Sequence, residues 1–365
     1  MLPAMRRPPL VLGIETSCDD TACAVLDGQG RVLSSVVSSQ LASHRPYGGV
    51  VPEIASREHL SNWPLVSGEA LERAGVALPE VEVVAATRGP GLVGALLVGL
   101  AIGKSIAFAL ERPFLAIHHL EGHLYSPFLP PRDVDAPAEP VPARFVGLVV
   151  SGGHTSLFAV EDRPDGRVAT LGETRDDAMG EVFDKVGKRL GLPYPQGPLV
   201  DELAERGNPA ARRFATPLRG ETLDFSYSGL KSQALLEIEK LERELGPIDL
   251  GRPEIAPESE PPQTVLDLLA GFRAATVAQV IDRLDRLAGQ REIPLLAVSG
   301  GVAANRLLRR ELPAWAERRG VDLRLVPLAW AGDNAAMIAH AALLRHRRGQ
   351  ADDPFQTEAE SRIPL

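Results

Sequence analysis

Two histidines four residues apart have the spacing for shared chemistry. His119 and His123 lie in the stretch FLAIHHLEGHLYSPFL, which begins as the end of a buried strand and continues with helical spacing. A helix places both imidazoles on one face, one turn apart, where two neutral imidazoles can bind one divalent metal ion. Taken alone, such a pair is more commonly two surface or helix-capping histidines, so the metal interpretation depends on the rest of the chain.

Two neighbours of this pair are expected to stay outside a metal site. His118 lies about 100° around the helix from His119. Glu121 is midway between the two histidines and turned away from their shared face. A zinc protease instead places a glutamate directly after its first histidine. The spacing therefore disfavours a metallopeptidase.

Length, composition and charge limit the classes of protein to which this chain can belong. A chain of 365 residues exceeds one ordinary core and predicts two domains or one duplicated domain. The net charge of −9 argues against broad nucleic-acid binding, although a local basic patch is compatible with it. Cys18 and Cys23 do not form a disulfide framework. With no signal-peptide-like run and no stretch near the roughly 20 apolar residues of a membrane span, we expect a cytoplasmic protein.

The predicted strands and helices occur twice in the same order. Residues 10–37 read as a meander of three antiparallel strands with a turn at Asp27, and the chain from Ala143 repeats it with a turn at Asp165. A strand, a glycine turn and a helix occur in VEVVAATRGPG with its apolar helix and again in PLLAVSGGVAANRLLRREL. Chance recurrence is the alternative, but four elements in one order with matched glycine turns indicate an internal duplication.

The duplication gives the histidine pair a distant counterpart. The strand, loop and helix of the histidine stretch recur as VDLRLVPLAWAGDNAAMIAHAALL, with Asp333 at the head of the helix. His119 and Asp333 follow their glycine turns at similar distances. We therefore expect two halves, residues 1–135 with the histidine pair and residues 143–365 with Asp333 and a helical insert at about 173–290.

Two α/β halves that each begin with a meander predict the duplicated actin-like fold of actin, Hsp70 and sugar kinases, in which two halves surround a nucleotide-binding cleft. Its glycine turns approach phosphates because backbone N–H groups can point at an anion. Ser151-Gly152-Gly153 and Ser299-Gly300-Gly301 are the candidates. One Gly-Gly turn is usually only a turn, whereas two at equivalent positions favour a ligand site.

Motifs along nearly the whole chain carry a resemblance to one family. In order they are GIETSCDDTACAV, YGGVVPEIASREH, GPGLVGALLVGLAIGKS, HHLEGH, LVVSGGHTSL, GEVFDKVGK, DFSYSGLK, SGGVAANRLLR and GDNAAMIA. As a set they resemble the universal tRNA adenosine threonylcarbamoyltransferase family in its bacterial branch, whose members have the actin-like fold. The resemblance implies metal-assisted transfer of the threonylcarbamoyl group from threonylcarbamoyl-adenylate, with release of AMP. The acceptor is the exocyclic amine of the adenosine 3′ of the anticodon in tRNAs that read codons beginning with A.

The resemblance also implies site residues, position by position. Its metal ligands fall on His119, His123 and Asp333, and two imidazoles with one carboxylate leave open positions on a metal, as in catalytic sites. Nothing in the sequence identifies a general base. Contacts to the adenylate and the threonylcarbamoyl group fall on Val149, Val150, Ser151, Gly152, Gly153, Asp184, Gly197, Asp201 and Asn305.

Some of these positions have simpler interpretations. Asp184 and Asp201, each taken alone, are more commonly solvated helix carboxylates, and Asn305 after a glycine turn is equally a helix N-cap. The chain also departs from the family pattern. Gln196 stands where the family usually has a glycine, and the loop 249–262 is longer than usual. Neither departure touches the expected metal ligands.

The resemblance implies a cofactor and partners as well. It implies one divalent metal per subunit, with Fe(2+) favoured and Zn(2+) also compatible with imidazole and carboxylate ligands. The expected partners are tRNA, threonylcarbamoyl-adenylate, a TsaB-like paralogue as heterodimer partner and a TsaE-like ATPase, with no membrane. The alternative function is an actin-like ATPase or small-molecule kinase, which needs only Mg-nucleotide, so metal analysis of the purified protein separates the two. A metallopeptidase is a more distant alternative.

Overall fold

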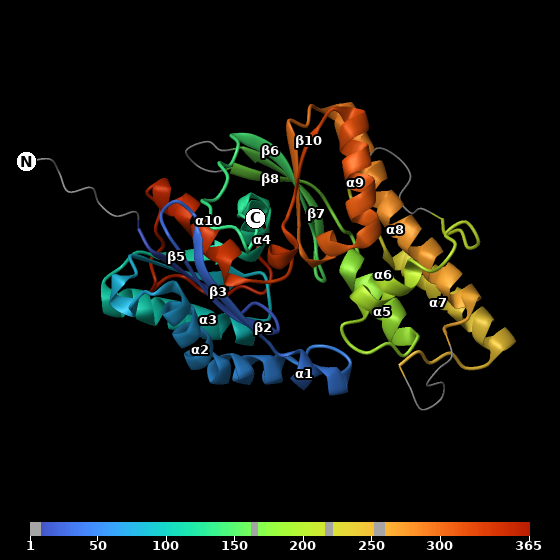
Figure 1. Cartoon of the computed structure of the whole chain (residues 1–365), viewed down its shortest axis with the longest axis horizontal. Helices are drawn as coiled ribbons and strands as arrows, with labels where there is room; N and C mark the ends of the chain where they lie inside the picture. Colours follow the sequence, from blue (N-terminus) through green and yellow to red (C-terminus); the bar gives the residue numbers. More distant parts are fainter. Residues whose placement is uncertain (1–8, 162–166, 216–221, 252–259) are drawn as a thin grey trace, which may run out of the picture. The chain divides into compact units, whose positions relative to one another are not determined.

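The computed structural model describes residues 9–161, 167–215, 222–251 and 260–365 (Figure 1). Contacts divide the chain into two compact units. Met1–Pro142 and Val326–Leu365 form the first unit, and Ala143–Leu325 form the second. The turn expected at Asp165 lies outside the described residues, as does most of the loop 249–262.

The first unit is built on a five-stranded mixed sheet with the order β3-β2-β1-β4-β5. The first three strands form the expected antiparallel meander, and β4 and β5 continue the sheet parallel to β1. The strands are β1 (Val11–Glu15), β2 (Asp20–Leu26), β3 (Val32–Ser39), β4 (Val83–Gly89) and β5 (Phe114–His118).

Helices cover both faces of this sheet, because successive side chains of β1 point to opposite faces and its first four residues are apolar or small. Leu12 and Ile14 pack into a core with Val66 and Leu100 of the helices α2 and α3. Gly13 points to the opposite face, which α10 covers. The helices of this unit are α1 (Leu41–His44), α2 (Pro52–Ala74), α3 (Val93–Leu110), α4 (His119–Tyr125) and α10 (Ala335–Arg347), with the 3₁₀ turns η1 (Arg45–Tyr47), η2 (Leu78–Glu80), η3 (Ser126–Phe128) and η5 (Leu328–Trp330).

The place of α10 corrects one expectation. The repeat in the sequence assigned Val326–Leu365 to the second half, but in the structure this segment belongs to the first unit. A Cβ at Gly13 would lie only 2.4 Å from the carbonyl oxygen of Ala335. A glycine in β1 and alanines in α10 thus allow a backbone approach that fixes the helix on this sheet. Asp333 therefore lies in the same unit as both histidines.

The second unit repeats the sheet in the order β10-β9-β6-β7-β8. Its three meander strands are again antiparallel, and β9 and β10 again run parallel to the first of them. Every strand has its counterpart in the first unit, which confirms the duplicated actin-like fold. The strands are β6 (Arg144–Val150), β7 (Thr155–Glu161), β8 (Arg167–Glu173), β9 (Leu295–Ser299) and β10 (Asp322–Leu325).

Helices follow β8 where the sequence indicated an insert. They are α5 (Met179–Arg189), α6 (Gln196–Ala204), α7 (Ser228–Leu245) and α8 (Gln263–Gln290), and after β9 come η4 (Gly301–Ala304) and α9 (Arg306–Arg319). Helix α6 begins at Gln196. Pro198 lies in its first turn, where a missing N–H costs no hydrogen bond.

In the part of the chain that the structure describes, two helices are by length and composition apolar enough to cross a membrane, which corrects the expectation that no stretch comes near that length. The most apolar 18-residue windows have a mean hydropathy of 2.0 in α3 and 1.4 in α8. Helix α8 is mostly buried inside its unit, as the core helix of a soluble protein is. Helix α3 packs on β4 and α2 and leaves Leu97 and Phe108 exposed.

Candidate functional site

Helix α4 carries the histidine pair and has only seven residues. His118 caps it, because its Nδ1 accepts a hydrogen bond from the Leu120 N–H at 3.1 Å. Glu121 lies 4.0 Å from Arg345, and burial raises the pKa of its carboxyl group. The glutamate therefore faces Arg345 and not the histidine pair, which is not the arrangement of a zinc protease.

Three side chains with metal-binding atoms meet in the first unit. Oδ1 of Asp333 lies 3.5 Å from Nε2 of His119 and 3.3 Å from Nε2 of His123. One ligand atom from each residue lies within 4.8 Å of the others, so one ion can touch all three. Asp333 precedes α10, whose N-cap Asn334 accepts a hydrogen bond from the Met337 N–H at 2.9 Å.

A buried carboxylate stands behind the first histidine. Oε2 of Glu15 lies 3.2 Å from Nδ1 of His119, and the Ser17 hydroxyl lies at the same distance from that nitrogen. Glu15 is fully buried at the end of β1 and accepts a hydrogen bond from the Thr87 hydroxyl at 2.7 Å. A carboxylate that accepts from Nδ1–H fixes the tautomer and leaves Nε2 free as a metal ligand.

The protonation and hydrogen bonding of the two histidines indicate whether a metal ion fits this site. Burial alone would lower the pKa of His119, but the carboxylates of Asp333 and Glu15 raise it to about 9. Burial lowers the pKa of His123, whose Nε2 faces Asp333 at 3.3 Å and whose Nδ1 is buried without a hydrogen-bond partner. Leaving such atoms without a ligand is costly. Two imidazoles and one carboxylate therefore fit a divalent transition metal.

Sequence reasoning missed two acidic residues near this centre. Glu15 was detectable as an acid that ends the otherwise apolar strand LVLGIE. Asp20 begins β2, and burial raises the pKa of its carboxyl group to about 7. Its Oδ1 is buried without a hydrogen-bond partner. Glu15 and Asp20 both interact electrostatically with Asp333, so the site concentrates negative charge that a cation would neutralise.

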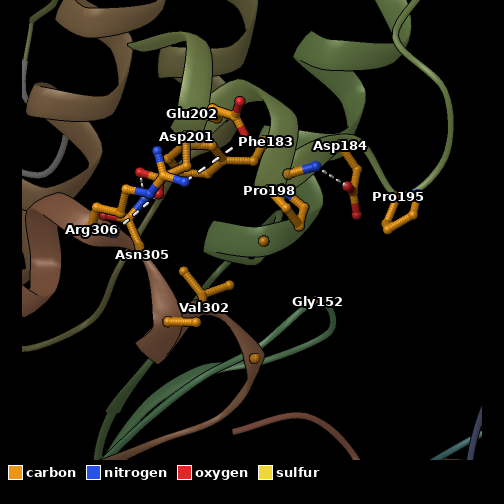
Figure 2. Close-up of a pocket in the computed structure, with 14 residues that line it drawn as sticks. Gly152, Phe183, Asp184, Pro195, Pro198, Asp201, Glu202, Val302, Asn305 and Arg306 are labelled. Atoms are coloured by element: carbon orange, nitrogen blue, oxygen red, sulfur yellow. Dashed lines mark hydrogen bonds and ion pairs between the residues drawn. The ribbon is translucent and has the colours of Figure 1, made fainter. Parts of the chain in front are cut away.

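A cavity of about 400 Å³ in the second unit brings together Gly152, Asp184, Gly197, Asp201 and Asn305 (Figure 2). These five belong to the substrate contacts that the resemblance implied. The cavity is also lined by Gly301 of the second candidate glycine turn and by residues that sequence reasoning did not assign. The latter are Gly180, Phe183, Pro195, Pro198, Glu202, Val302, Ala304 and Arg306.

The other implied contacts do not line this cavity. Val149 and Val150 are buried residues of β6, and Ser151 and Gly153 belong to the turn that follows. The motif GEVFDKVGK contains Gly180 and Phe183, and the motif SGGVAANRLLR contains Val302, Ala304 and Arg306. These motifs were the available signal for those missed residues.

The glycines of the two turns have different roles. Gly300 has φ +90°, and a Cβ there would lie 2.3 Å from the carbonyl oxygen of Val150, so the fold requires it. A Cβ at Gly152 or Gly301 would meet no protein atom within 4 Å. Packing does not explain these two glycines, which line the cavity and keep its wall open to a ligand.

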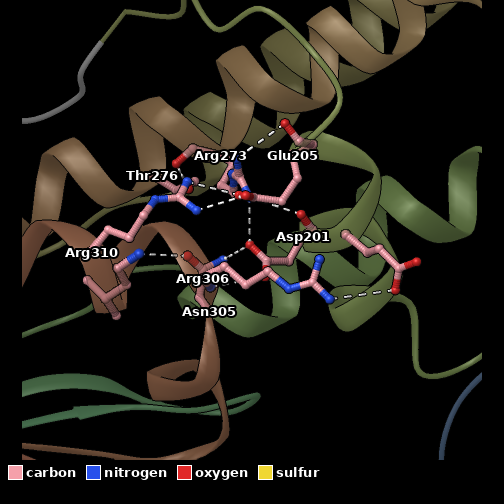
Figure 3. Close-up of polar contacts among 10 residues, drawn as sticks. Asp201, Glu205, Arg273, Thr276, Asn305, Arg306 and Arg310 are labelled. Atoms are coloured by element: carbon pink, nitrogen blue, oxygen red, sulfur yellow. Dashed lines mark hydrogen bonds and ion pairs between the residues drawn. The ribbon is translucent and has the colours of Figure 1, made fainter.

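Hydrogen bonds fix the polar groups of the cavity wall. Asp184 Oδ1 accepts from the Gly197 N–H at 2.8 Å, which ties α5 to the start of α6. Asp201 Oδ1 accepts from Asn305 Nδ2 at 2.7 Å, and its Oδ2 accepts from the Arg306 N–H at 3.1 Å (Figure 3). Asn305 is also the N-cap of α9. It therefore has both the structural role of a helix cap and a place in the cavity wall.

Arg273 of α8 lies behind this wall and is only 5% exposed. Its Nη1 donates to Asp201 Oδ1 at 3.1 Å and also to Glu205 (Figure 3). Hydrogen bonds from Arg310 and Arg273 lower the pKa of Glu205 to about 2. Nothing in the local sequence pattern pointed to Arg273, because its partners Asp201, Ala204 and Glu205 lie on α6 and at its C-terminal end, far away along the chain.

Comparison with known proteins agrees with the motifs. A family model described as tRNA N6-adenosine threonylcarbamoyltransferase matches residues 31–340. A curated protein of that description from Pelobacter propionicus is 48% identical over 331 residues, which cover 90% of each chain. Another from Rhizobium leguminosarum bv. trifolii is 46% identical over 378 residues and covers 100% of this chain and 95% of its own.

Solved structures with low identity share the fold. HypF from T. kodakarensis matches 94% of this chain and 48% of its own with a TM-score of 0.56 and 14% identity. Component A of (R)-2-hydroxyglutaryl-CoA dehydratase from Acidaminococcus fermentans matches 94% of this chain and 100% of its own with a TM-score of 0.53 and 15% identity. At such identity the likeness establishes the fold alone.

Proposed function

The chain belongs to the tRNA N6-adenosine threonylcarbamoyltransferase family, and we propose that it transfers the threonylcarbamoyl group from threonylcarbamoyl-adenylate to adenosine 3′ of the anticodon in tRNAs that read A-starting codons. The family is metal-dependent. The observation that carries the proposal for this chain is the meeting of His119, His123 and Asp333, with Nδ1 of His123 buried without a hydrogen-bond partner.

The proposed reaction is an acyl transfer at one carbonyl carbon. The exocyclic N6 of the adenosine attacks the carbonyl carbon of the threonylcarbamoyl group. A C–N bond forms, the C–O bond to the phosphate breaks, one N6 proton is lost, and AMP leaves. Negative charge grows on the carbonyl and phosphate oxygens during this step, so catalysis requires groups that stabilise it.

His119, His123 and Asp333 would hold the metal, and Glu15 keeps His119 in the tautomer that presents Nε2. When bound, the metal supplies Lewis-acid stabilisation of negative charge on oxygens. The ligand set is compatible with Fe(2+) and Zn(2+), and we choose Fe(2+) on the family resemblance.

The adenylate part of the donor is assigned to the cavity of the second unit. Gly152 and Gly301 leave room for it, and Phe183 and Val302 supply apolar surface. Its polar groups include the carboxylate of Asp184 for hydroxyl or amine groups, and Arg306 is the cationic residue among those that line it. Because the donor carries negative charge on its phosphate and its threonyl carboxylate, Arg306 is suited to attract it.

Partner proteins and location are assigned on the family resemblance. Helix α3 exposes Val93, Leu97 and Phe108 at 45%, 54% and 67%. An apolar exposed stripe of this kind suits a protein partner, and we assign it to the TsaB-like paralogue. A TsaE-like ATPase, tRNA as acceptor, a cytoplasmic location and no membrane complete the proposal.

Two measurements test this function. Mass spectrometry of tRNA nucleosides should show loss of threonylcarbamoyladenosine in cells depleted of the protein. In vitro, the purified chain with its partners, metal and threonylcarbamoyl-adenylate should modify tRNA and release AMP in equal amounts. An unchanged nucleoside profile, together with hydrolysis of ATP that does not depend on tRNA, would point to an actin-like ATPase instead.

A further inference from the structure

The C-terminal tail, residues 352–363, lies along the edge of the first sheet that carries the histidine helix. Asp352 N–H donates to the Phe114 carbonyl at 2.8 Å, and its Oδ2 accepts from the Ala116 N–H at 2.9 Å. Further along, the Glu360 N–H donates to the Arg88 carbonyl at 2.9 Å. Figure 1 marks the end of the chain beside the label of α4. The tail thus covers β5, the edge strand that leads directly into the metal ligands.

The end of β4 is shaped to receive this tail. Gly89, its last residue, has φ +156°, and a Cβ there would lie 2.0 Å from the carbonyl oxygen of Glu360. No side chain fits this contact, so the strand end and the tail approach at backbone distance. The side chains of Arg88 and Glu360 form an ion pair across the same contact. These contacts hold the last residues in one place.

His118 connects the seated tail to α4. Its Nδ1 accepts the hydrogen bond of the Leu120 N–H, so this nitrogen carries no proton. Its Nε2 lies 3.0 Å from the carbonyl oxygen of Ile363 and must donate to it. The ring is only 6% exposed, so water replaces this acceptor poorly. The tail carbonyl therefore selects the tautomer and ring orientation that cap α4.

We propose that the C-terminal tail is a positioning element for the metal ligands, acting from the Ile363 carbonyl through the His118 ring to α4. The inference depends on the metal site of the proposed function. A helix of seven residues does not hold its own geometry, so its cap and its packing decide where His119 and His123 point. Loss of one cap should weaken metal binding by about three- to tenfold.

Truncation at neighbouring positions tests the proposal. A chain that ends at Arg362 lacks the Ile363 carbonyl, whereas a control chain that ends at Pro364 keeps it. The dissociation constant for Co(2+), followed by its visible absorption, should rise about three- to tenfold in the first chain and stay unchanged in the second. Equal affinity in the two truncated chains would overturn the proposal.

A second variant separates positioning from general loss of stability. Asn in place of His118 keeps a side-chain acceptor for the Leu120 N–H without using Ile363. In the His118→Asn background, ending the chain at Arg362 should change Co(2+) affinity by less than about twofold, because the two changes act on one contact. The same three- to tenfold loss in both backgrounds would show that the tail acts by another route and would refute the proposal.

Hydrogen exchange of the metal-free protein gives a readout independent of metal. The Leu120 amide should exchange faster in the chain ending at Arg362 than in the chain ending at Pro364. Failure of the full-length chain to bind Co(2+) would remove the metal site of the proposed function. The exchange rates would still decide whether the tail holds α4, and equal rates would count against it.

Discussion

The metal centre of the first unit and the cavity of the second unit are built on matching sheets but in opposite ways. In the first, His119 and His123 present nitrogens toward Asp333, and the buried Nδ1 of His123 has no hydrogen-bond partner. In the second, both side-chain oxygens of Asp201 and the side-chain amide of Asn305 are engaged in hydrogen bonds. One site keeps atoms unsatisfied for a ligand, and the other uses its polar atoms to fix a wall.

This difference predicts different responses to substitution. A site that relies on unsatisfied atoms should lose its ligand when one of them is removed, with little loss of stability, because those atoms cost stability without a ligand. A wall held by a saturated network should lose both stability and affinity when one member is removed, because a buried charge is left without a partner.

The largest effect is expected from Asp333→Asn. This change keeps the shape but removes the charge that the two imidazoles face, so bound metal should fall below stoichiometric amounts and transfer to tRNA should drop by about 10³-fold or more. The melting temperature of the metal-free protein should stay within a few degrees of the wild type. Metal analysis and nucleoside mass spectrometry measure the two losses. Asp322→Asn, at an exposed position of β10, is the control, and full metal content in Asp333→Asn would remove the metal site.

Arg273→Met should break the second site without touching the first. It leaves Asp201 buried without its cation, so we expect a loss of about 3–5 kcal/mol in the free energy of unfolding and a rise of about 100-fold in KM for the donor. Metal content should not change. Arg212→Met is the matched control, since Arg212 pairs with Glu237 at 3.0 Å but is a third exposed, and should cost less than about 1 kcal/mol. Lost metal in Arg273→Met would contradict the separation of the two sites.

Glu15→Gln tests whether a residue that orients a metal ligand has a smaller effect on metal affinity than a metal ligand has. The variant keeps the volume of Glu15 but loses the carboxylate that accepts from Nδ1 of His119. Metal affinity should fall by about tenfold, well short of the effect of Asp333→Asn. Competition with a chelator measures the change. An affinity equal to the wild type would mean that Glu15 does not orient His119.

The two units should also differ in their response to acid. Burial lowers the pKa of His340 in α10 to about 4. As the pH falls below the pKa of about 6.5 in the unfolded chain, His340 is protonated in the unfolded chain but stays neutral in the folded one. The free energy of unfolding of the first unit should therefore fall by about 2 kcal/mol between pH 7 and pH 5. The pKa of Glu205 in the second unit is lowered to about 2. The stability that this carboxylate contributes is therefore present above about pH 4.5 and is lost only as the pH falls from about 4.5 toward 2.

Melting temperature against pH measures this difference. His340→Gln removes the titrating group and keeps a donor for the Tyr125 carbonyl, which His340 Nδ1 contacts at 3.2 Å. The decline in melting temperature between pH 7 and pH 5 should become shallower in this variant. His346→Gln, partly exposed on the same helix, is the control. An unchanged slope in His340→Gln would show that another group dominates the acid response.

The sequence by itself determined the features that depend on local spacing. The meanders, the glycine turns and the repeated order of elements were readable because strand and helix periods and turn residues act over a few positions. The helix with His119 and His123 followed from the same rule, and so did Asp333 as the head of a later helix. The motifs along the chain indicated the family, which the comparisons establish.

Only the tertiary structure decided which of these elements share a unit. Asp333 joins the histidines because Gly13 lets α10 approach β1 at backbone distance. Glu15 stands behind His119, and Arg273 behind Asp201, because strands and helices far apart in the chain pack together. Such contacts depend on which small side chains allow close packing and on which buried charges find a partner, and neither property has a period that a single sequence displays.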